Sequence, residues 1–181
     1  MNVWKDINPD RITPDDFVAF IEIEQGSKNK YELDKETGLI ILDRVLYTAT
    51  HYPMNYGFIP RTLSGDKDPL DVFVLCSQPI EKMSLVRCYP IGVVFMKDRD
   101  ETDEKIIAIP FNDPQYNNIR SLEDMPNHIM DELRHFLSVY KQLEGKQVHI
   151  LETGFVQEAE RTIELCMDRF NVVFGKKSQK K

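Results

Sequence analysis

Long apolar runs and paired cysteines are both missing from this sequence of 181 residues. No apolar stretch approaches the roughly 20 residues that a membrane-spanning helix needs, so we expect no membrane partner. Residues 1–10 are polar and acidic, without the basic start and apolar core of a signal peptide. The three cysteines, Cys76, Cys88 and Cys166, are odd in number and have no CxxC spacing, which is typical of reduced thiols. These absences predict a cytoplasmic protein.

Positive charge is also scarce, because 30 acidic residues stand against 23 basic ones and give a formal net charge of −7. Binding to nucleic-acid phosphates needs a basic surface, so we expect no nucleic-acid partner. The apolar fraction of 41% is ordinary for a globular protein, and the chain is long enough to bury a core. We therefore expect a single domain over residues 1–181, with a frayed basic tail at 176–181.

Short apolar segments separated by Gly, Pro, Asp and Asn dominate the first part of the chain. Residues 17–23 alternate between apolar and polar, which is typical of a half-buried strand. Further strands are expected at 30–33, 39–45, 72–75, 85–96 and 105–110. Several short strands in succession indicate a small antiparallel β-barrel or sandwich.

After Pro110 the pattern changes to helical spacing. Apolar residues recur with this spacing over 126–144, and Gly145 supplies a stop. One more strand is expected at 146–151, followed by a second amphipathic helix at 158–174. Strands followed by helices predict an α+β domain in which two main helices pack on a small antiparallel barrel.

Three aspartates lie within six residues at Asp66, Asp68 and Asp71, just before the apolar segment 72–75. Crowded carboxylates cost electrostatic energy unless cations neutralise them. Their oxygen atoms suit Mg²⁺, Mn²⁺ or Ca²⁺ rather than zinc. The alternative is an acidic turn whose aspartates cap backbone groups, and the spacing alone leaves both interpretations open.

Two further charged groups accompany this cluster. Asp98 and Asp103 belong to an acidic segment between two expected strands, where a solvated hairpin loop is the ordinary interpretation. Lys30 and Glu32 share one face of a strand because side chains alternate along it. Charges of mixed sign on one strand face are usually an exposed pair across strands, so these positions alone decide nothing.

Taken together and in order, these segments resemble family I soluble inorganic pyrophosphatases over about residues 22–141. The segments that carry the resemblance are Ile21-Glu22-Ile23, Lys30-Tyr31-Glu32-Leu33-Asp34-Lys35, Asp43-Arg44, Tyr52-Pro53-Met54-Asn55-Tyr56-Gly57-Phe58-Ile59, Asp66-Lys67-Asp68-Pro69-Leu70-Asp71, Asp98 with Asp103 and Lys105, and Tyr140-Lys141. The D-x-D-P-x-D segment is similar to the signature of that family. The chain departs from the family pattern at Arg99, where Glu or Gln is usual.

The resemblance implies an OB-like, five-stranded barrel and Mg²⁺-dependent hydrolysis of pyrophosphate to two orthophosphates. A hydroxide that bridges two metal ions would attack directly, without a covalent intermediate, and Asp68 would accept the proton of that water. Several Mg²⁺ ions would bind, with Mn²⁺ or other divalent ions able to substitute and Ca²⁺ substituting poorly. The metal ligands implied are Asp66, Asp71, Asp103, Asp98 and Glu32. The residues implied to bind phosphate oxygens are Lys30, Arg44, Tyr56, Lys105, Tyr140 and Lys141. Glu22 would line the site, and Tyr52 would support the cluster by hydrogen bonding.

Relatives of this kind are often hexamers in bacteria and dimers in eukaryotes, and this compact chain without long extensions favours a homo-hexamer. Three other functions stay open on the sequence. One is a metal-dependent phosphohydrolase that acts on nucleotides or phosphomonoesters. Another is a barrel that stacks nucleic-acid bases on Tyr52, Tyr56 and Phe58. The third is a structural module that binds divalent cations without turnover.

Overall fold

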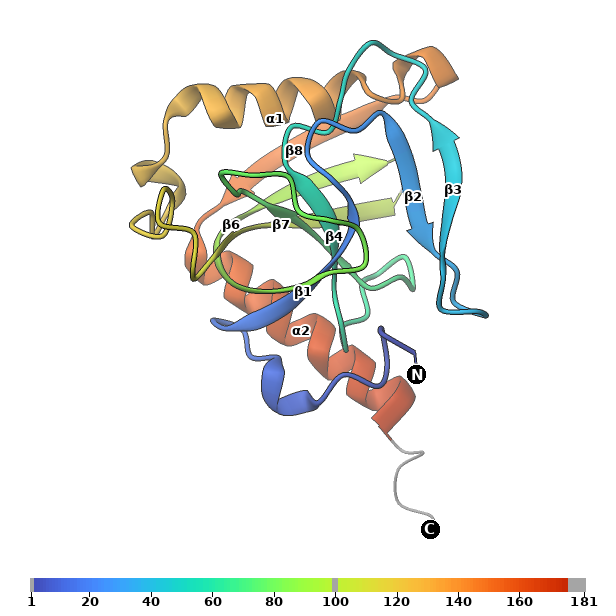
Figure 1. Cartoon of the computed structure of the whole chain (residues 1–181), viewed down its shortest axis with the longest axis vertical. Coiled ribbons are helices and arrows are strands. Elements are labelled where there is room, and N and C mark those ends of the chain that lie inside the picture. The colour runs from blue at the N-terminus through green and yellow to red at the C-terminus, as the bar shows by residue number, and fades with distance from the viewer. Residues whose placement is uncertain (1, 99–100, 176–181) are drawn as a thin grey trace.

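The computed structural model describes residues 2–98 and 101–175, except for the side chains of Asp98 and Glu101. Arg99 and the expected tail at 176–181 lie outside the described residues. The main elements, in chain order (Figure 1), are β1 (Phe17–Ile23), β2 (Asn29–Leu33), β3 (Ile40–Val45), β4 (Asn55–Ile59), β5 (Leu70–Val74), β6 (Leu85–Asp98), β7 (Glu101–Pro110), α1 (Asn127–Val139), β8 (Val148–Gly154) and α2 (Val156–Phe174).

Five strands close into a ring. β1 pairs with β4, β4 with β5, β5 with β7, β7 with β6, and β6 returns to β1. The β5–β7 pairing is parallel, and the other four pairings of the ring are antiparallel. β8 extends the sheet beside β6, while β2 and β3 form a separate hairpin. The predicted α+β class, with a five-stranded barrel, is confirmed.

Two main helices flank this barrel, as predicted. α1 packs beside β8, and α2 packs along β6 and β7. In Figure 1, α1 lies above the strands, α2 below them, and the β2–β3 hairpin stands at the side. Among the described residues, no helix combines the length and apolar character required to cross a membrane.

The prediction that β1 is half-buried is wrong. Its seven residues are all buried, because both faces of the strand are covered. Phe20 packs in a cluster with Trp4 and Phe170, whereas Ile23 belongs to the core cluster that also contains residues of α1. A strand covered on two sides reads as a nearly continuous apolar run.

The first helix is shorter than the predicted range 126–144. The α-helix ends at Val139, and a separate 3₁₀ turn, Gln142–Glu144, follows it. Gly145 ends this turn with φ 71°, so its role as a stop is confirmed. Tyr140 and Lys141 therefore lie between the end of the α-helix and this 3₁₀ turn.

The strand β4 was not predicted, because Asn55 and Gly57 are residues typical of turns. Both have a structural reason to be in a strand. The buried Asn55 side chain accepts from the N–H groups of Gln25 and Ile80 and so ties two loops to the barrel. A Cβ on Gly57 would lie 1.8 Å from the carbonyl oxygen of Phe20, so only glycine permits the close β1–β4 pairing here.

Candidate active site

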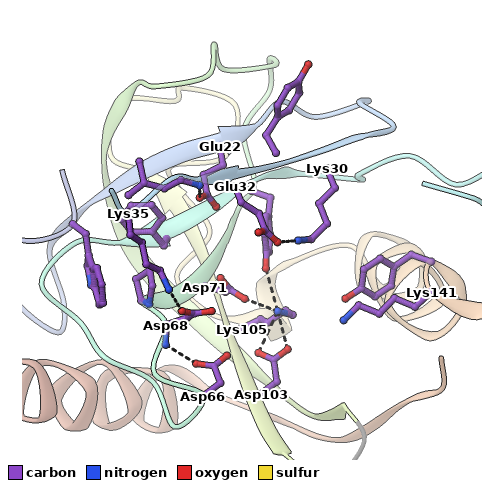
Figure 2. Close-up of a pocket in the computed structure, with 17 residues that line it drawn as sticks. Glu22, Lys30, Glu32, Lys35, Asp66, Asp68, Asp71, Asp103, Lys105 and Lys141 are labelled. Atoms are coloured by element: carbon purple, nitrogen blue, oxygen red, sulfur yellow. Dashed lines mark hydrogen bonds and ion pairs between the residues drawn. The ribbon is translucent and has the colours of Figure 1, made fainter. Parts of the chain in front are cut away.

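A cavity of about 260 Å³ lies where the open end of the barrel meets the β2–β3 hairpin and the end of α1. It is lined by Trp4, Glu22, Lys30, Tyr31, Glu32, Leu33, Lys35, Tyr56, Phe58, Asp66, Asp68, Pro69, Asp71, Asp103, Lys105, Tyr140 and Lys141. Figure 2 shows carboxylates and ammonium groups from distant parts of the chain pointing into this one space.

Most of the predicted site residues meet in this cavity. The predicted residues that line it are Asp66, Asp68, Asp71, Asp103, Glu22, Glu32, Lys30, Lys105, Tyr56, Tyr140 and Lys141. Arg44 and Tyr52 do not line it. The Asp98 side chain lies outside the described part of the structure. The acidic residues therefore converge, as the prediction of a common centre requires.

A tight turn between β4 and β5 presents the first aspartates. The Asp68 N–H donates to Asp66 Oδ1 at 2.9 Å, and the Asp68 C=O accepts from the Ser64 N–H at 2.7 Å. Lys67 between them has φ 71°, a left-handed conformation that reverses the chain. Asp66 thus caps the turn, as the alternative interpretation expected, and also faces the cavity.

Lys105 occupies the centre of the acidic group. It stands opposite Asp71 in the parallel β5–β7 register, and its Nζ lies 2.6 Å from Asp71 Oδ2. The same Nζ lies 3.1 Å from Asp103 Oδ2 and donates to the Tyr56 hydroxyl at 3.1 Å. Only 3% of Lys105 is exposed, so one buried ammonium group compensates two carboxylates (Figure 2).

Burial and mutual repulsion control the proton affinities of the site. Burial, and then the charge of Asp71, raises the pKa of Glu22 to about 8. Burial raises the pKa of Asp66 to about 6, and it raises the pKa of Asp103 despite the nearby Lys105. Although burial opposes it, the carboxylates of Asp103 and Asp71 hold the pKa of Lys105 well above its usual value. Burial thus favours the protonated forms of Glu22, Asp66 and Asp103.

Comparisons with known proteins assign the chain to a family. A sequence profile of the family described as inorganic pyrophosphatase matches residues 19–171. The chain belongs to that family. Inorganic pyrophosphatase of Aquifex pyrophilus is 43% identical over 170 residues, which cover 92% of this chain and 96% of the relative. Membership of the pyrophosphatase family makes the chain a hydrolase, and the predicted resemblance to this family is confirmed.

Two solved structures of the pyrophosphatase family share the fold. The inorganic pyrophosphatase of Helicobacter pylori superposes with a TM-score of 0.84 at 38% identity, covering 87% of this chain and 95% of that one. The enzyme of Thermus thermophilus superposes with a TM-score of 0.87 at 34% identity, covering 94% of this chain and 99% of that one. The similarity therefore extends over nearly the whole length of these relatives.

The carboxylate oxygens of the cavity suit a divalent metal, although in this structure the carboxylates pair with lysines. Among residues 2–98 and 101–175, no three His, Cys, Asp or Glu side chains are grouped tightly enough to hold a metal ion. Instead, Lys30 pairs with Glu32, Lys35 with Asp68, and Lys105 with Asp71 and Asp103. Burial raises the pKa of Asp66 and Asp103 because it penalises their charged forms, and a divalent cation bound through carboxylate oxygens would offset this penalty.

Arg44 lies beside the cavity rather than in its wall. It stands opposite Lys30 in the β2–β3 register, and its Nε lies 2.7 Å from Glu144 Oε1 after α1. Its Nη1 also pairs with the neighbouring Asp43. Arg44 therefore links the hairpin to the end of α1, and its role toward a substrate stays a prediction.

Sequence reasoning assigned no role to Lys35 and Trp4, which also line the cavity. Lys35 lies within the Lys30–Lys35 segment that carried the family resemblance, so its position offered a signal. Trp4 is the only tryptophan in the chain, but it lies far from the other motifs in sequence. Only the folded chain shows that the N-terminal segment reaches the site.

We expect the metal-free protein to lose stability as pH rises from about 5 to about 8. The folded state holds the Glu22 proton up to a pKa of about 8, against an ordinary value of 4.5, so folding is favoured most below the lower value. Raising the pH through 8 removes this contribution, on the order of 1–3 kcal/mol. Urea unfolding at several pH values in chelator measures it.

The variant Glu22→Gln should make this pH dependence shallower, most clearly above pH 6, because the amide keeps the acceptor for the Leu33 N–H but does not titrate. The raised pKa values of Asp66 and Asp103 should leave a smaller slope. Glu24→Gln is the matched control, since Glu24 lies two residues further along and is partly exposed beside Lys82. It should keep the wild-type slope. An unchanged slope in Glu22→Gln would show that another group is responsible.

Proposed function

We propose that this protein hydrolyses inorganic pyrophosphate to two orthophosphates with the help of several Mg²⁺ ions. The observation that carries the proposal is the convergence of Asp66, Asp71 and Asp103 on one cavity that also holds four lysines. A polyanionic substrate needs cations between itself and such carboxylates. The role would belong to phosphate metabolism, in the cytoplasm and within a single domain, with no nucleic-acid or membrane partner.

The metal ions would be held by Asp66, Asp71, Asp103, Asp98 and Glu32. When bound, divalent ions supply positive charge to the phosphoryl oxygens and lower the pKa of water at the site. The chain contributes the placement of the carboxylates: β5 brings Asp71 and β7 brings Asp103, both beside the Lys105 ammonium group. Displacement of Lys105 from these carboxylates would free it for the substrate.

Asp68 would act as the general base. Its carboxylate lines the cavity on a turn fixed by backbone hydrogen bonds, and its side chain is 55% exposed and so within reach of water. Taking a proton from water as it attacks phosphorus requires no covalent intermediate with the protein. Glu22, buried against the Leu33 N–H, would line the opposite wall.

Cationic and phenolic groups would bind the phosphate oxygens. The proposed groups are Lys30, Arg44, Tyr56, Lys105, Tyr140 and Lys141. Burial raises the pKa of Tyr56 well above its usual value, so its hydroxyl stays protonated and able to donate. Tyr52, buried against Tyr56 and Phe136, would support this wall by packing. Arg44 would grip phosphate through its planar fork once it leaves Glu144.

The rival functions have less support. Tyr52, Tyr56 and Phe58 are 2%, 9% and 1% exposed, so these rings offer no open platform for stacking bases. A phosphohydrolase acting on nucleotides would need room for a base and sugar beside the phosphate groups. Phosphate release from purified protein separates the functions: pyrophosphate with Mg²⁺ should give rapid release, ATP with Mg²⁺ little, and added chelator should stop it. Release from ATP but not from pyrophosphate would favour the phosphohydrolase that acts on nucleotides.

We expect Ca²⁺ to replace Mg²⁺ poorly, and Mn²⁺ to replace it better. Ca²⁺ prefers six to eight oxygen ligands at longer and less regular distances than the octahedral arrangement of Mg²⁺. Phosphate release measured with each ion alone at the same concentration should therefore rank Mg²⁺ and Mn²⁺ above Ca²⁺ by at least about 10-fold. Equal rates with Ca²⁺ would contradict this ligand geometry.

We also propose that the protein assembles as a homo-hexamer. The separate β2–β3 hairpin exposes apolar side chains, among them Leu39 at 60%, Leu42 at 53% and Val45 at 47%. Exposed apolar residues gathered on one element are typical of a surface that another subunit covers. Light scattering after size exclusion should give a mass of six chains, and a monomeric mass would rule the assembly out.

A further inference from the structure

Lys35 contacts the proposed base, although the proposed function gives it no role. It lies in the turn between β2 and β3, and its ammonium group pairs with the Asp68 carboxylate (Figure 2). The Asp68 backbone is fixed by hydrogen bonds to Asp66 and Ser64, but its side chain is 55% exposed. Lys35 is the side-chain partner that the described residues provide for this carboxylate. The Asp68 carboxylate thus makes its side-chain contact with a residue of another element, the turn between β2 and β3.

Trp4 holds Lys35 within reach of Asp68. The Lys35 Nζ lies 5.5 Å from the centre of the indole ring, within the range of a cation–π contact. The indole N–H donates to the Thr62 C=O at 2.8 Å, and Thr62 Oγ1 accepts from the Leu70 N–H at 2.8 Å. Thr62 and Leu70 flank the turn that carries Asp68. One aromatic ring thus connects Lys35 to both ends of that turn.

We propose that Lys35, seated on Trp4, is a positioning residue that aims the Asp68 carboxylate into the cavity. The proposal rests on the proposed function, in which Asp68 is the general base. A base must lie within hydrogen-bond reach of the proton that it takes, and a displacement of about 1 Å can cost up to about 100-fold in rate. An exposed ion pair is weak, so it sets this direction without binding Asp68 so tightly that it blocks proton transfer.

The test compares Lys35→Met with Lys35→Arg. Methionine keeps an apolar side chain of similar length beside Trp4 but removes the charge, whereas arginine keeps the charge and the reach. We expect Lys35→Met to lower kcat for pyrophosphate with Mg²⁺ about 10-fold while KM changes less than about 3-fold. The variant Lys35→Arg should keep most of the wild-type kcat. A raised KM with unchanged kcat would make Lys35 a substrate-binding residue and overturn the proposal.

Lys5→Met is the matched control. Lys5 Nζ lies 5.0 Å from the centre of the same indole ring, but the described residues show no contact between Lys5 and Asp68. Removing this charge should leave kcat and KM unchanged. An equal loss of kcat in Lys5→Met would show that the effect comes from packing around Trp4, which would contradict a specific role for Lys35.

A double-mutant cycle tests whether Lys35 acts through Asp68. In an Asp68→Asn background, Lys35→Met should change kcat by less than about 2-fold, because the group that it positions is already gone. A full 10-fold loss in that background would show that Lys35 acts independently, and the proposal would be wrong.

Fluorescence of Trp4 separates this proposal from the proposed function. Trp4 is the only tryptophan, so its emission reports on the nearby Lys35 charge without any turnover. Asp68→Asn should release Lys35 and change the emission, and the change should vanish in the Lys35→Met background. If this coupling is present but the wild type releases no phosphate, the contact stands and the proposed function fails. If phosphate is released but both the coupling and the kcat effect are absent, Lys35 has no positioning role.

Discussion

Replacing Asp68 by asparagine should lower kcat for pyrophosphate hydrolysis by a factor on the order of 100 or more, while the protein stays folded. Asparagine has the same shape but cannot accept a proton from the attacking water. The Asp68 backbone keeps its hydrogen bonds to Asp66 and Ser64, and its exposed side chain adds little to the core. Steady-state phosphate release at saturating Mg²⁺ measures the loss.

Asp131→Asn is the control for this loss. Asp131 lies on α1 and is 66% exposed beside Arg134, away from the cavity lining. The control should keep full activity, and both variants should unfold within about 0.5 kcal/mol of the wild type. If Asp68→Asn retained nearly full activity, the general base would have to be another group.

Replacing Lys105 by methionine should lower the free energy of unfolding by about 3 kcal/mol in metal-free buffer. The change removes the buried ammonium group and leaves the carboxylates of Asp71 and Asp103 facing each other without compensation. Added Mg²⁺ should restore part of the loss, since a divalent cation can take the place of the ammonium group. Urea unfolding with chelator and with Mg²⁺ measures both effects.

Lys97→Met provides the comparison, because Lys97 is an exposed residue of β6 in the same β6–β7 hairpin. Its removal should change stability by no more than about 0.5 kcal/mol, with or without Mg²⁺. If Lys105→Met proved as stable as this control in chelator, Lys105 would not be the group that holds the two carboxylates together.

Much of the barrel could be predicted from local pattern, because most of its strands are apolar runs bounded by turn residues. The exceptions depend on contacts distant in sequence. β4 contains Asn55 and Gly57, which look like turn residues until the loops around Gln25 and Ile80 and the carbonyl of Phe20 are in place. The parallel β5–β7 pairing also depends on the closure of the whole ring, which no local pattern encodes.

The site was predicted through motif order rather than through geometry. Asp66, Asp68 and Asp71 lie within six residues of one another, so their proximity in space follows from the sequence alone. Spacing alone could not show that Lys105 would stand between Asp71 and Asp103, because that contact follows from the register of two strands more than 30 residues apart. Trp4 was missed for the same reason, since the N-terminal segment reaches the cavity only in the folded chain.

The parallel β5–β7 pair has a consequence for how the enzyme matures. The connection between these two strands includes β6. Asp71 and Lys105 therefore become neighbours only after the chain has passed through β6 and β7 has paired with β5. Contacts so remote along the chain form slowly during folding. A nascent or partly refolded polypeptide should therefore have no working centre, and recovery of turnover after dilution from urea should lag behind the recovery of helical signal.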